Sequence, residues 1–141
     1  MDPRRTPELA DRLGMAAVRL ARLLRQQDEG ELTPTMRATL GTISREAPLT
    51  LGELAASERV APPTITKVVG KLEDAGLVAR EVDADDRRIV RVSLTAEGRR
   101  RLDADRRRRR DWLTDQVRRL GDDDVARLAE AVEVIEKLTV A

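Results

Sequence analysis

Two consecutive prolines near the middle of the chain, Pro62 and Pro63, constrain the fold more than any other feature. Neither residue can donate a backbone hydrogen bond, so within a helical pattern both fit only the first turn of a helix. From Thr64 to about Ala75 the apolar residues recur at helical spacing. The sequence therefore predicts a helix that begins at the prolines and buries Ile65, Val68 or Val69, and Leu72.

A second, shorter helix is predicted just before the prolines. The stretch Thr50-Leu51-Gly52-Glu53 is a capping box, in which Thr50 is the N-cap and Glu53 lies three residues further on. This helix covers TLGELAASE, and residues 59–61 form a tight turn before the prolines. After the second helix, Gly76 is expected as a left-handed C-cap, and Leu77 supplies the hydrophobic contact that follows such a cap.

Two strands are predicted after these helices, over residues 77–82 and 88–94, because apolar and polar side chains alternate in the second of them. The residues between the strands, Asp83 to Arg87, form a polar tip of turn-forming type. A lone hairpin is unstable in water, so this one must pack on the helices. Two short helices followed by such a hairpin define a winged helix-turn-helix, which holds one helix against a nucleic-acid groove.

The flanking segments predict helices with narrow apolar seams. Residues 8–27 place leucines and alanines at spacings of three and four, and the segment after Asp122, the expected N-cap of the last helix, repeats the pattern. Thr33 and Thr95 are the expected N-caps of two further helices, of which the second is long and highly charged. A single winged unit cannot bury both terminal seams, so the sequence predicts a twofold homodimer.

The expected fold class is mainly α, with a small β-hairpin wing and dimerisation helices at both ends of the chain. The predicted division assigns residues 1–32 and 112–141 to a helical dimerisation region. Residues 33–98 form the winged helix-turn-helix domain, and residues 99–111 form the charged connecting part of the long helix.

Composition argues against catalysis and metal binding. The chain has no cysteine and no histidine, so it lacks thiolate ligands, disulfides and the commonest general base. There is also no glycine-rich phosphate loop. We expect neither enzymatic activity nor a cofactor or metal. The N-terminus carries no apolar run and no segment is long enough to span a membrane, which predicts a cytoplasmic protein.

The charge distribution limits how the winged unit could bind DNA. The chain has a net charge of +1, but residues 50–98 hold seven basic and nine acidic side chains. Binding to DNA would therefore depend on a few placed cations and not on a general positive field. The same acidic balance leaves open a second hypothesis, in which the winged helix is a protein-interaction module without sequence-specific DNA binding.

Residues 60–98 resemble the MarR family (multiple antibiotic resistance regulators). The stretch VAPPTITKVVGKLEDAGLV is similar to the recognition helix of that family, and DDRRIVRVSLTAEG is similar to its wing. The most recognisable part is Asp86, one residue, Arg88, and then Leu94-Thr95-Ala96-Glu97-Gly98. Two positions depart from the family pattern, because Ala61 replaces a small polar N-cap and Arg59 stands where glycine is frequent.

The resemblance implies a function and an assembly. It implies an obligate homodimer that binds a pseudopalindromic operator in double-stranded DNA and represses its own or a neighbouring gene. It further implies release from the DNA by a small, anionic or aromatic effector held between the winged unit and the dimer helices.

Two groups of residues are the candidates for DNA contact. On the second helix of the unit, hydroxyl and ammonium groups can reach phosphates and base edges. At the wing, arginine suits a narrow minor groove, and a carboxylate can orient it through a bidentate pair. The alternatives are an ordinary solvated helix face and an exposed salt bridge. The candidates are Pro63, Thr64, Thr66, Lys67, Lys71, Asp86, Arg87 and Arg88.

The arginine run at residues 106–110 has two possible uses. Arg106 and Arg109 share the helical phase of Leu102 and Leu113, so they point to one side of the long helix. They could pair with the acids at residues 28–31, or they could hold an anionic effector. Trp112 is a candidate ligand platform, although a lone tryptophan more often belongs to a core.

Overall fold

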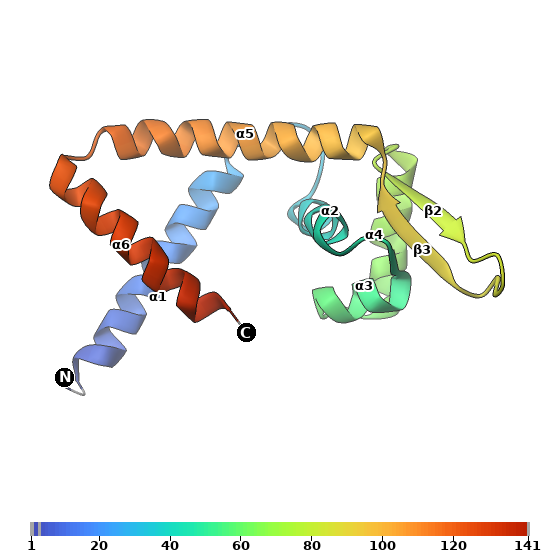
Figure 1. The fold of residues 1–141 in the computed structure, drawn as a ribbon, viewed down its shortest axis with the longest axis horizontal. Helices are drawn as coiled ribbons and strands as arrows, with labels where there is room; N and C mark the ends of the chain where they lie inside the picture. Colours follow the sequence, from blue (N-terminus) through green and yellow to red (C-terminus); the bar gives the residue numbers. More distant parts are fainter. Residues whose placement is uncertain (1, 3, 141) are drawn as a thin grey trace. The chain divides into compact units, whose positions relative to one another are not determined.

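The computed structural model describes residue 2 and residues 4–140, which divide into two compact units. One unit comprises residues 28–107, and the other comprises residues 1–27 together with 108–141. Figure 1 shows the elements, and the fold class is mainly α with one small sheet, as predicted. They are α1 (Arg5–Arg25), α2 (Pro34–Glu46), β1 (Leu49–Thr50), α3 (Leu51–Glu58), α4 (Pro62–Asp74), β2 (Val78–Val82), β3 (Val90–Leu94), α5 (Ala96–Arg118) and α6 (Asp122–Thr139).

The sheet of the unit formed by residues 28–107 is antiparallel, in the order β1-β3-β2. The predicted hairpin is present, with Val78 opposite Leu94 and Val82 opposite Val90. A two-residue strand that the sequence analysis did not predict, β1, pairs Leu49 with Val92 on the other edge of β3. Because Val92 is fully buried, the central strand joins the wing to the helical core.

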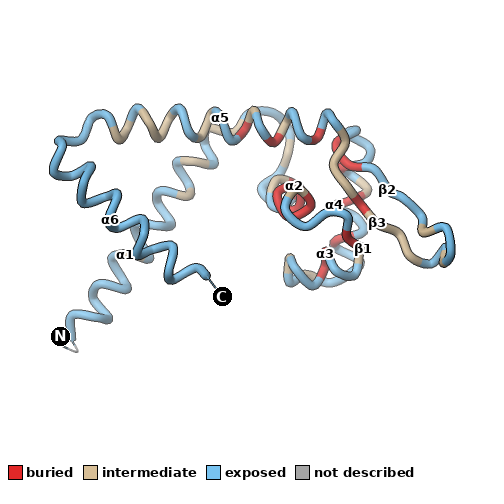
Figure 2. Tube along the Cα trace, in the orientation of Figure 1, coloured by how far each residue is buried: buried red, intermediate tan, exposed pale blue. Residues whose placement is uncertain are grey.

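The core of this unit is aliphatic and lies between α2, α3, α4 and the sheet, where the buried segments are red in Figure 2. The helix starting at the prolines buries the predicted side, with Val69 and not Val68 as the fully buried valine. Ala47 continues the helical spacing of Leu40 and Ile43, but it is exposed because it lies just beyond the end of α2. The largest fully buried side chains are Leu40, Ile43, Leu54, Ile65, Leu72, Val69, Val92 and Thr39.

Helix starts follow the predicted caps with one exception. Thr33 accepts a hydrogen bond from the Met36 N–H at 3.1 Å, and Thr50 accepts one from the Glu53 N–H at 3.1 Å. The prediction that Asp122 caps the last helix is wrong. Gly121 is the N-cap of α6 and Asp122 is already helical. The acidic residues of this first turn are favourable there because they face the positive end of the helix dipole.

The segment Leu94 to Gly98 joins the wing, the end of α4 and the start of α5. The hydroxyl of Thr95 accepts from the Gly98 N–H at 3.0 Å and donates to the Gly76 carbonyl at 2.6 Å. A Cβ at Gly98 would overlap the carbonyl of Leu77. Glycine is therefore required for the first turn of α5 to lie against the backbone that follows α4, which has its left-handed turn at Gly76 (φ 77°).

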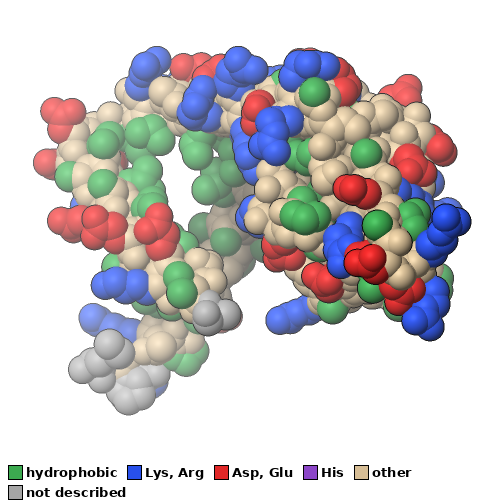
Figure 3. Space-filling model, turned by 45° about the vertical axis from the view of Figure 1, so that its right-hand side comes forward, with side chains coloured by type: hydrophobic (Ala, Val, Ile, Leu, Met, Phe, Trp, Pro, Cys, Tyr) green, Lys and Arg blue, Asp and Glu red, His purple; other side chains and the backbone are tan. Residues whose placement is uncertain are grey.

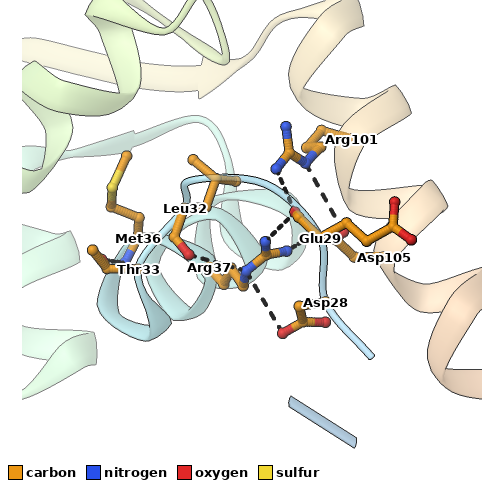
Figure 4. Close-up of polar contacts among 8 residues, drawn as sticks. All are labelled: Asp28, Glu29, Leu32, Thr33, Met36, Arg37, Arg101 and Asp105. Atoms are coloured by element: carbon orange, nitrogen blue, oxygen red, sulfur yellow. Dashed lines mark hydrogen bonds and ion pairs between the residues drawn. The ribbon is translucent and has the colours of Figure 1, made fainter. Parts of the chain in front are cut away.

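A largely buried cluster of charged residues ties α5 to α2 and to the loop that precedes α2 (Figure 4). The Arg37 guanidinium pairs with Asp105 and lies 3.6 Å from Asp28. It also donates to the Glu29 carbonyl at 2.6 Å, and Arg101 donates to the same oxygen at 2.7 Å. The side chains of Arg37, Asp28 and Asp105 are each no more than 10% exposed. This cluster, residues 28, 29, 37, 101 and 105, stabilises the base of the winged unit.

The other unit is built from α1, α6 and the second part of α5, and it leaves much apolar surface uncovered. Neither α1 nor α6 has a buried residue. In Figure 2, α6 is pale blue over its described range and α1 is mostly pale blue with short tan stretches. Green hydrophobic side chains are visible beside the red acidic ones on the left of Figure 3. The exposed apolar residues include Leu9, Met15, Val18, Leu20, Leu23, Val125, Leu128, Val132, Ile135 and Leu138. Across residues 2 and 4–140 no helix combines the length and the apolar character that a membrane crossing requires.

Candidate nucleic-acid interface

The helix α4 presents a buried face and a polar face of opposite character. Pro62 and Pro63 occupy its first turn, and Ala61 provides no side-chain cap, so the prolines alone set where the helix begins. Their fixed φ suits the first turn of a helix, where the missing N–H groups would have no partner in any case. Ile65, Val69 and Leu72 anchor one side in the core. The sequence therefore fixes both the start of α4 and the face it turns to solvent.

The structure places all the candidate residues of α4 in solvent. The hydroxyl of Thr66 donates to the Pro62 carbonyl at 3.0 Å, which leaves its oxygen lone pairs available as acceptors. Lys67 and Lys71 are one helical turn apart, and neither has an ion pair or side-chain hydrogen bond with the described residues. Two free ammonium groups on one face are suited to an anionic partner. The exposed candidates are Pro63, Thr64, Thr66, Lys67 and Lys71.

The wing holds Arg88 through the expected bidentate pair. The Nε and Nη2 atoms of Arg88 each lie 3.1 Å from an oxygen of Asp86, and the Arg88 N–H donates to the same carboxylate at 3.0 Å. These hydrogen bonds lower the pKa of Asp86 and raise the pKa of Arg88. The Arg88 side chain is still 91% exposed, so it is oriented but not covered.

The position of Arg87 differs from that of its neighbour. It lies at the exposed tip and has no ion pair or side-chain hydrogen bond with any residue that the structure describes. Its long side chain is therefore unrestrained, whereas that of Arg88 is held by Asp86. The two arginines of the tip thus offer an anionic partner one guanidinium that Asp86 orients and one that no described residue holds.

Asp83 organises the wing tip, although the sequence analysis did not single it out. Its carboxylate accepts from the N–H groups of Asp85 and Asp86 at 2.8 and 2.9 Å, and from Arg91 at 2.7 Å. The hydrogen bond from Arg91, followed by those from the backbone, lowers the pKa of Asp83 to about 2. An Asp that begins a polar turn and accepts from backbone two residues on is a known turn pattern, so the sequence held a usable signal.

The candidate ligand residues lie along α5. Arg106 belongs to the unit of residues 28–107, whereas Arg109 and Trp112 belong to the other unit. Arg106 is exposed, and Arg109 and Trp112 are partly buried. The residues that contact Asp28 and the Glu29 carbonyl include Arg37 and Arg101. The sequence analysis missed both because it considered only the arginine run at residues 106–110 as partners for the acids at residues 28–31. No group of three or more acidic side chains among the described residues is placed to hold a metal ion.

Together these features define the chain as a winged helix-turn-helix protein, and comparison with known proteins identifies its family. Residues 32–90 match the MarR family. An HTH-type transcriptional regulator of Mycobacterium leprae is 37% identical over 131 residues, which is 92% of each chain. The chain belongs to the MarR family of transcriptional regulators, and it is not an enzyme.

Solved structures agree with this assignment. A crystal structure of a protein from Pseudomonas aeruginosa is 32% identical and has a TM-score of 0.88, with 97% of each chain covered. A mutant of MepR of Staphylococcus aureus, solved bound to an oligodeoxyribonucleotide, is 21% identical and has a TM-score of 0.73. The match covers 93% of this chain and 98% of that chain. At that identity MepR supports the fold alone. The fold of nearly the whole chain is thus shared with known proteins.

Proposed function

We propose that the protein is a homodimeric, sequence-specific DNA-binding regulator that represses its own or a neighbouring gene. The observation that carries this proposal is the exposed face of α4. There, two lysines that have no ion pair with the described residues and two threonines lie opposite a fully buried face. A rigid helix with this arrangement can enter a major groove without disturbing the core. The mutant of MepR, which has the same fold, was solved bound to an oligodeoxyribonucleotide, so a chain of this architecture can bind DNA.

The residues would have different roles at the DNA. Lys67 and Lys71 would contact phosphates or guanine edges, and the hydroxyls of Thr64 and Thr66 would contact base edges or phosphates. Pro63 would pack against the groove wall near the start of α4. At the wing, Arg87 and Arg88 would enter the minor groove, and Asp86 would orient Arg88 without contacting the DNA itself.

The uncovered apolar surface of α1 and α6 supports a homodimer. Contiguous apolar patches of this kind on a chain without a partner mark an interaction site. A second copy would cover this surface through a twofold interface and would present two winged units to one operator. The operator would then be pseudopalindromic, with half-sites spaced by the distance between the two α4 helices.

A small effector would release the DNA. Arg106 and Arg109 supply guanidinium groups and Trp112 supplies an aromatic face on the same helix, α5, which favours an anionic or aromatic molecule. A regulator of this kind would act in the cytoplasm on chromosomal DNA. Binding of the effector must favour a form of the dimer with low DNA affinity, because a ligand shifts an equilibrium only by its differential affinity.

Selection from random duplexes followed by quantitative binding tests the proposal. Wild-type protein is expected to enrich a pseudopalindrome, and Lys67→Ala is expected to weaken binding to it by about tenfold or more. Because a dimer carries two copies, the log–log salt slope is expected to fall by about 2. Lys137→Ala removes the same ammonium group from α6 and serves as the matched control, with unchanged affinity expected.

A second candidate function follows from the acidic balance of residues 50–98, which hold nine acidic and seven basic side chains. In this alternative the exposed face of α4 contacts a protein. Failure of a folded dimer to enrich any sequence would favour this alternative and would overturn the proposed repressor.

A further inference from the structure

The turn between α3 and α4 contains an arginine in a strained backbone conformation. Arg59 has φ 54° and ψ 43°, in the left-handed region. Among residues 2 and 4–140, Arg59 is the only non-glycine residue that has a positive φ. In this region the Cβ atom of an L-residue crowds the following carbonyl, a cost that glycine avoids. An arginine at this position therefore makes the fold less stable than a glycine would.

The backbone N–H of Arg59 donates to the carbonyls of Ala55 and Ala56, as in a left-handed helix cap, but no contact of its side chain with the described residues offsets the strain. Arg59 is exposed, and its guanidinium has no hydrogen bond or ion pair with the residues that the structure describes. Other arginines of the same unit have carboxylate partners: Arg80 pairs with Glu73, Arg88 with Asp86 and Arg91 with Asp83. The neighbouring acid, Glu58, accepts from Thr42 across the core side of α3. The guanidinium of Arg59 is thus free to meet an external anion.

The position of the turn indicates which anion that is. Arg59 lies three residues before the start of α4. Within the described residues, α4 and the wing have few cations that lack an ion pair. In helix-turn-helix proteins the second helix enters the groove by its N-terminal end, while the first crosses the DNA backbone. The turn between them consequently passes over the edge of the groove, where the phosphates lie. Guanidinium binds phosphate oxygens bidentately and with a fixed geometry.

We propose that Arg59 contacts a DNA-backbone phosphate at the edge of the groove entered by α4. Relative to glycine, the strained arginine lowers the stability of the fold and raises the affinity for DNA. The contact rests on the proposed function, because it requires DNA at α4. A phosphate contact carries no sequence information, so Arg59 strengthens binding to operator and to unrelated DNA alike. In a unit with more acidic than basic side chains, such a contact adds a cation without changing what α4 reads.

The variant Arg59→Gly tests this inference because its thermal stability should not fall, whereas its affinity for DNA should. Its melting temperature is expected to equal or exceed that of wild type, since glycine removes the left-handed strain. Its affinity for DNA is expected to fall by about tenfold, with a log–log salt slope lower by about 2 for the dimer. The same fold-loss is expected for operator and for unrelated DNA. Arg59→Lys keeps the charge and the strained backbone, and should retain most of the salt slope.

Each outcome decides a different point. If Arg59→Gly binds the operator with the wild-type affinity and salt slope, Arg59 makes no phosphate contact and the inference is overturned. A loss confined to the operator would show base reading and would also overturn it. If wild-type protein binds no DNA, the proposed function fails and this inference fails with it, whatever the variant does.

Discussion

The carboxylate of Asp83 accepts three hydrogen bonds at the start of the wing tip, and those bonds are stronger with the ionised form. Arg91 and two backbone N–H groups hold its pKa at about 2, below the ordinary 3.8. A lowered pKa in the folded state means that ionised Asp83 stabilises the protein at neutral pH. The contribution is present above the ordinary pKa and is lost as the pH falls through the folded-state pKa.

The variant Asp83→Asn is therefore expected to be less stable than wild type at pH 7. The difference should shrink as the pH falls from about 4 to about 2, because wild type then loses the ionised carboxylate as well. Urea denaturation at several pH values measures this. Asp85→Asn is the control, because the Asp85 side chain makes no hydrogen bond or ion pair within the described residues. A stability difference independent of pH in this range would contradict the role of Asp83.

Gly98 gives a second prediction for a single residue. A Cβ there overlaps the Leu77 carbonyl, and backbone atoms cannot rotate away as a side chain can. Gly98→Ala should therefore displace the start of α5 and destabilise the fold by about 1–3 kcal/mol. Gly52→Ala in α3 brings its Cβ no closer than 3.9 Å to another atom, so it should be neutral or stabilise by up to about 1 kcal/mol. Equal effects in thermal denaturation would contradict this explanation of Gly98.

Among the elements, α2 and α5 are joined by the buried charged cluster of residues 28, 29, 37, 101 and 105. Asp105 is 5% exposed and pairs with Arg37, which is itself largely buried. Removing one partner from a buried pair leaves the other charge without compensation. Asp105→Ala is therefore expected to destabilise the protein by about 3 kcal/mol, with Asp28 still offering Arg37 partial compensation.

A pair on the surface of the same helix provides the control for that experiment. Arg100 and Glu97 are each more than half exposed, and such a pair contributes about 0–1 kcal/mol. Glu97→Ala should consequently change the free energy of unfolding little in the same denaturant titration. If Asp105→Ala and Glu97→Ala have similar effects, the cluster does not hold α5 in the way that its burial indicates.

Comparison of the elements with the sequence shows which features could be predicted. Helix starts were predictable because the caps are local: Thr33, Thr50 and Thr95 contact N–H groups three residues away. The two-residue strand β1 was not predictable, because its geometry depends on pairing with β3, which lies about forty residues later in the chain. The Arg37–Asp105 pair was missed for the same reason, since 68 residues separate its members. In the candidate interface, the exposed face of α4 followed from helical periodicity, whereas Asp83 depended on the geometry of a turn.

At the scale of the whole molecule, the apolar surface of α6 leads to a prediction about assembly. Leu128 and Ile135 are each 39% exposed on a helix without a buried residue. In the proposed homodimer they contact the second copy, so Leu128→Glu should yield monomers in sedimentation experiments. The melting temperature of wild type should rise with protein concentration, whereas that of the variant should not. Glu130→Gln is the control, and a dimer that survives Leu128→Glu would exclude this face as the interface.

The shared contact at Glu29 has a consequence for any study of this protein by substitution. Two guanidinium groups meet at its backbone carbonyl, so that contact belongs to the main chain and not to the glutamate side chain. It would persist with any other side chain at residue 29, so substitution of that residue alone would not report on it. Replacing the amide between residues 29 and 30 by an ester makes the Glu29 carbonyl a weaker acceptor. That change, or substitution of both arginines together, would measure this main-chain interaction.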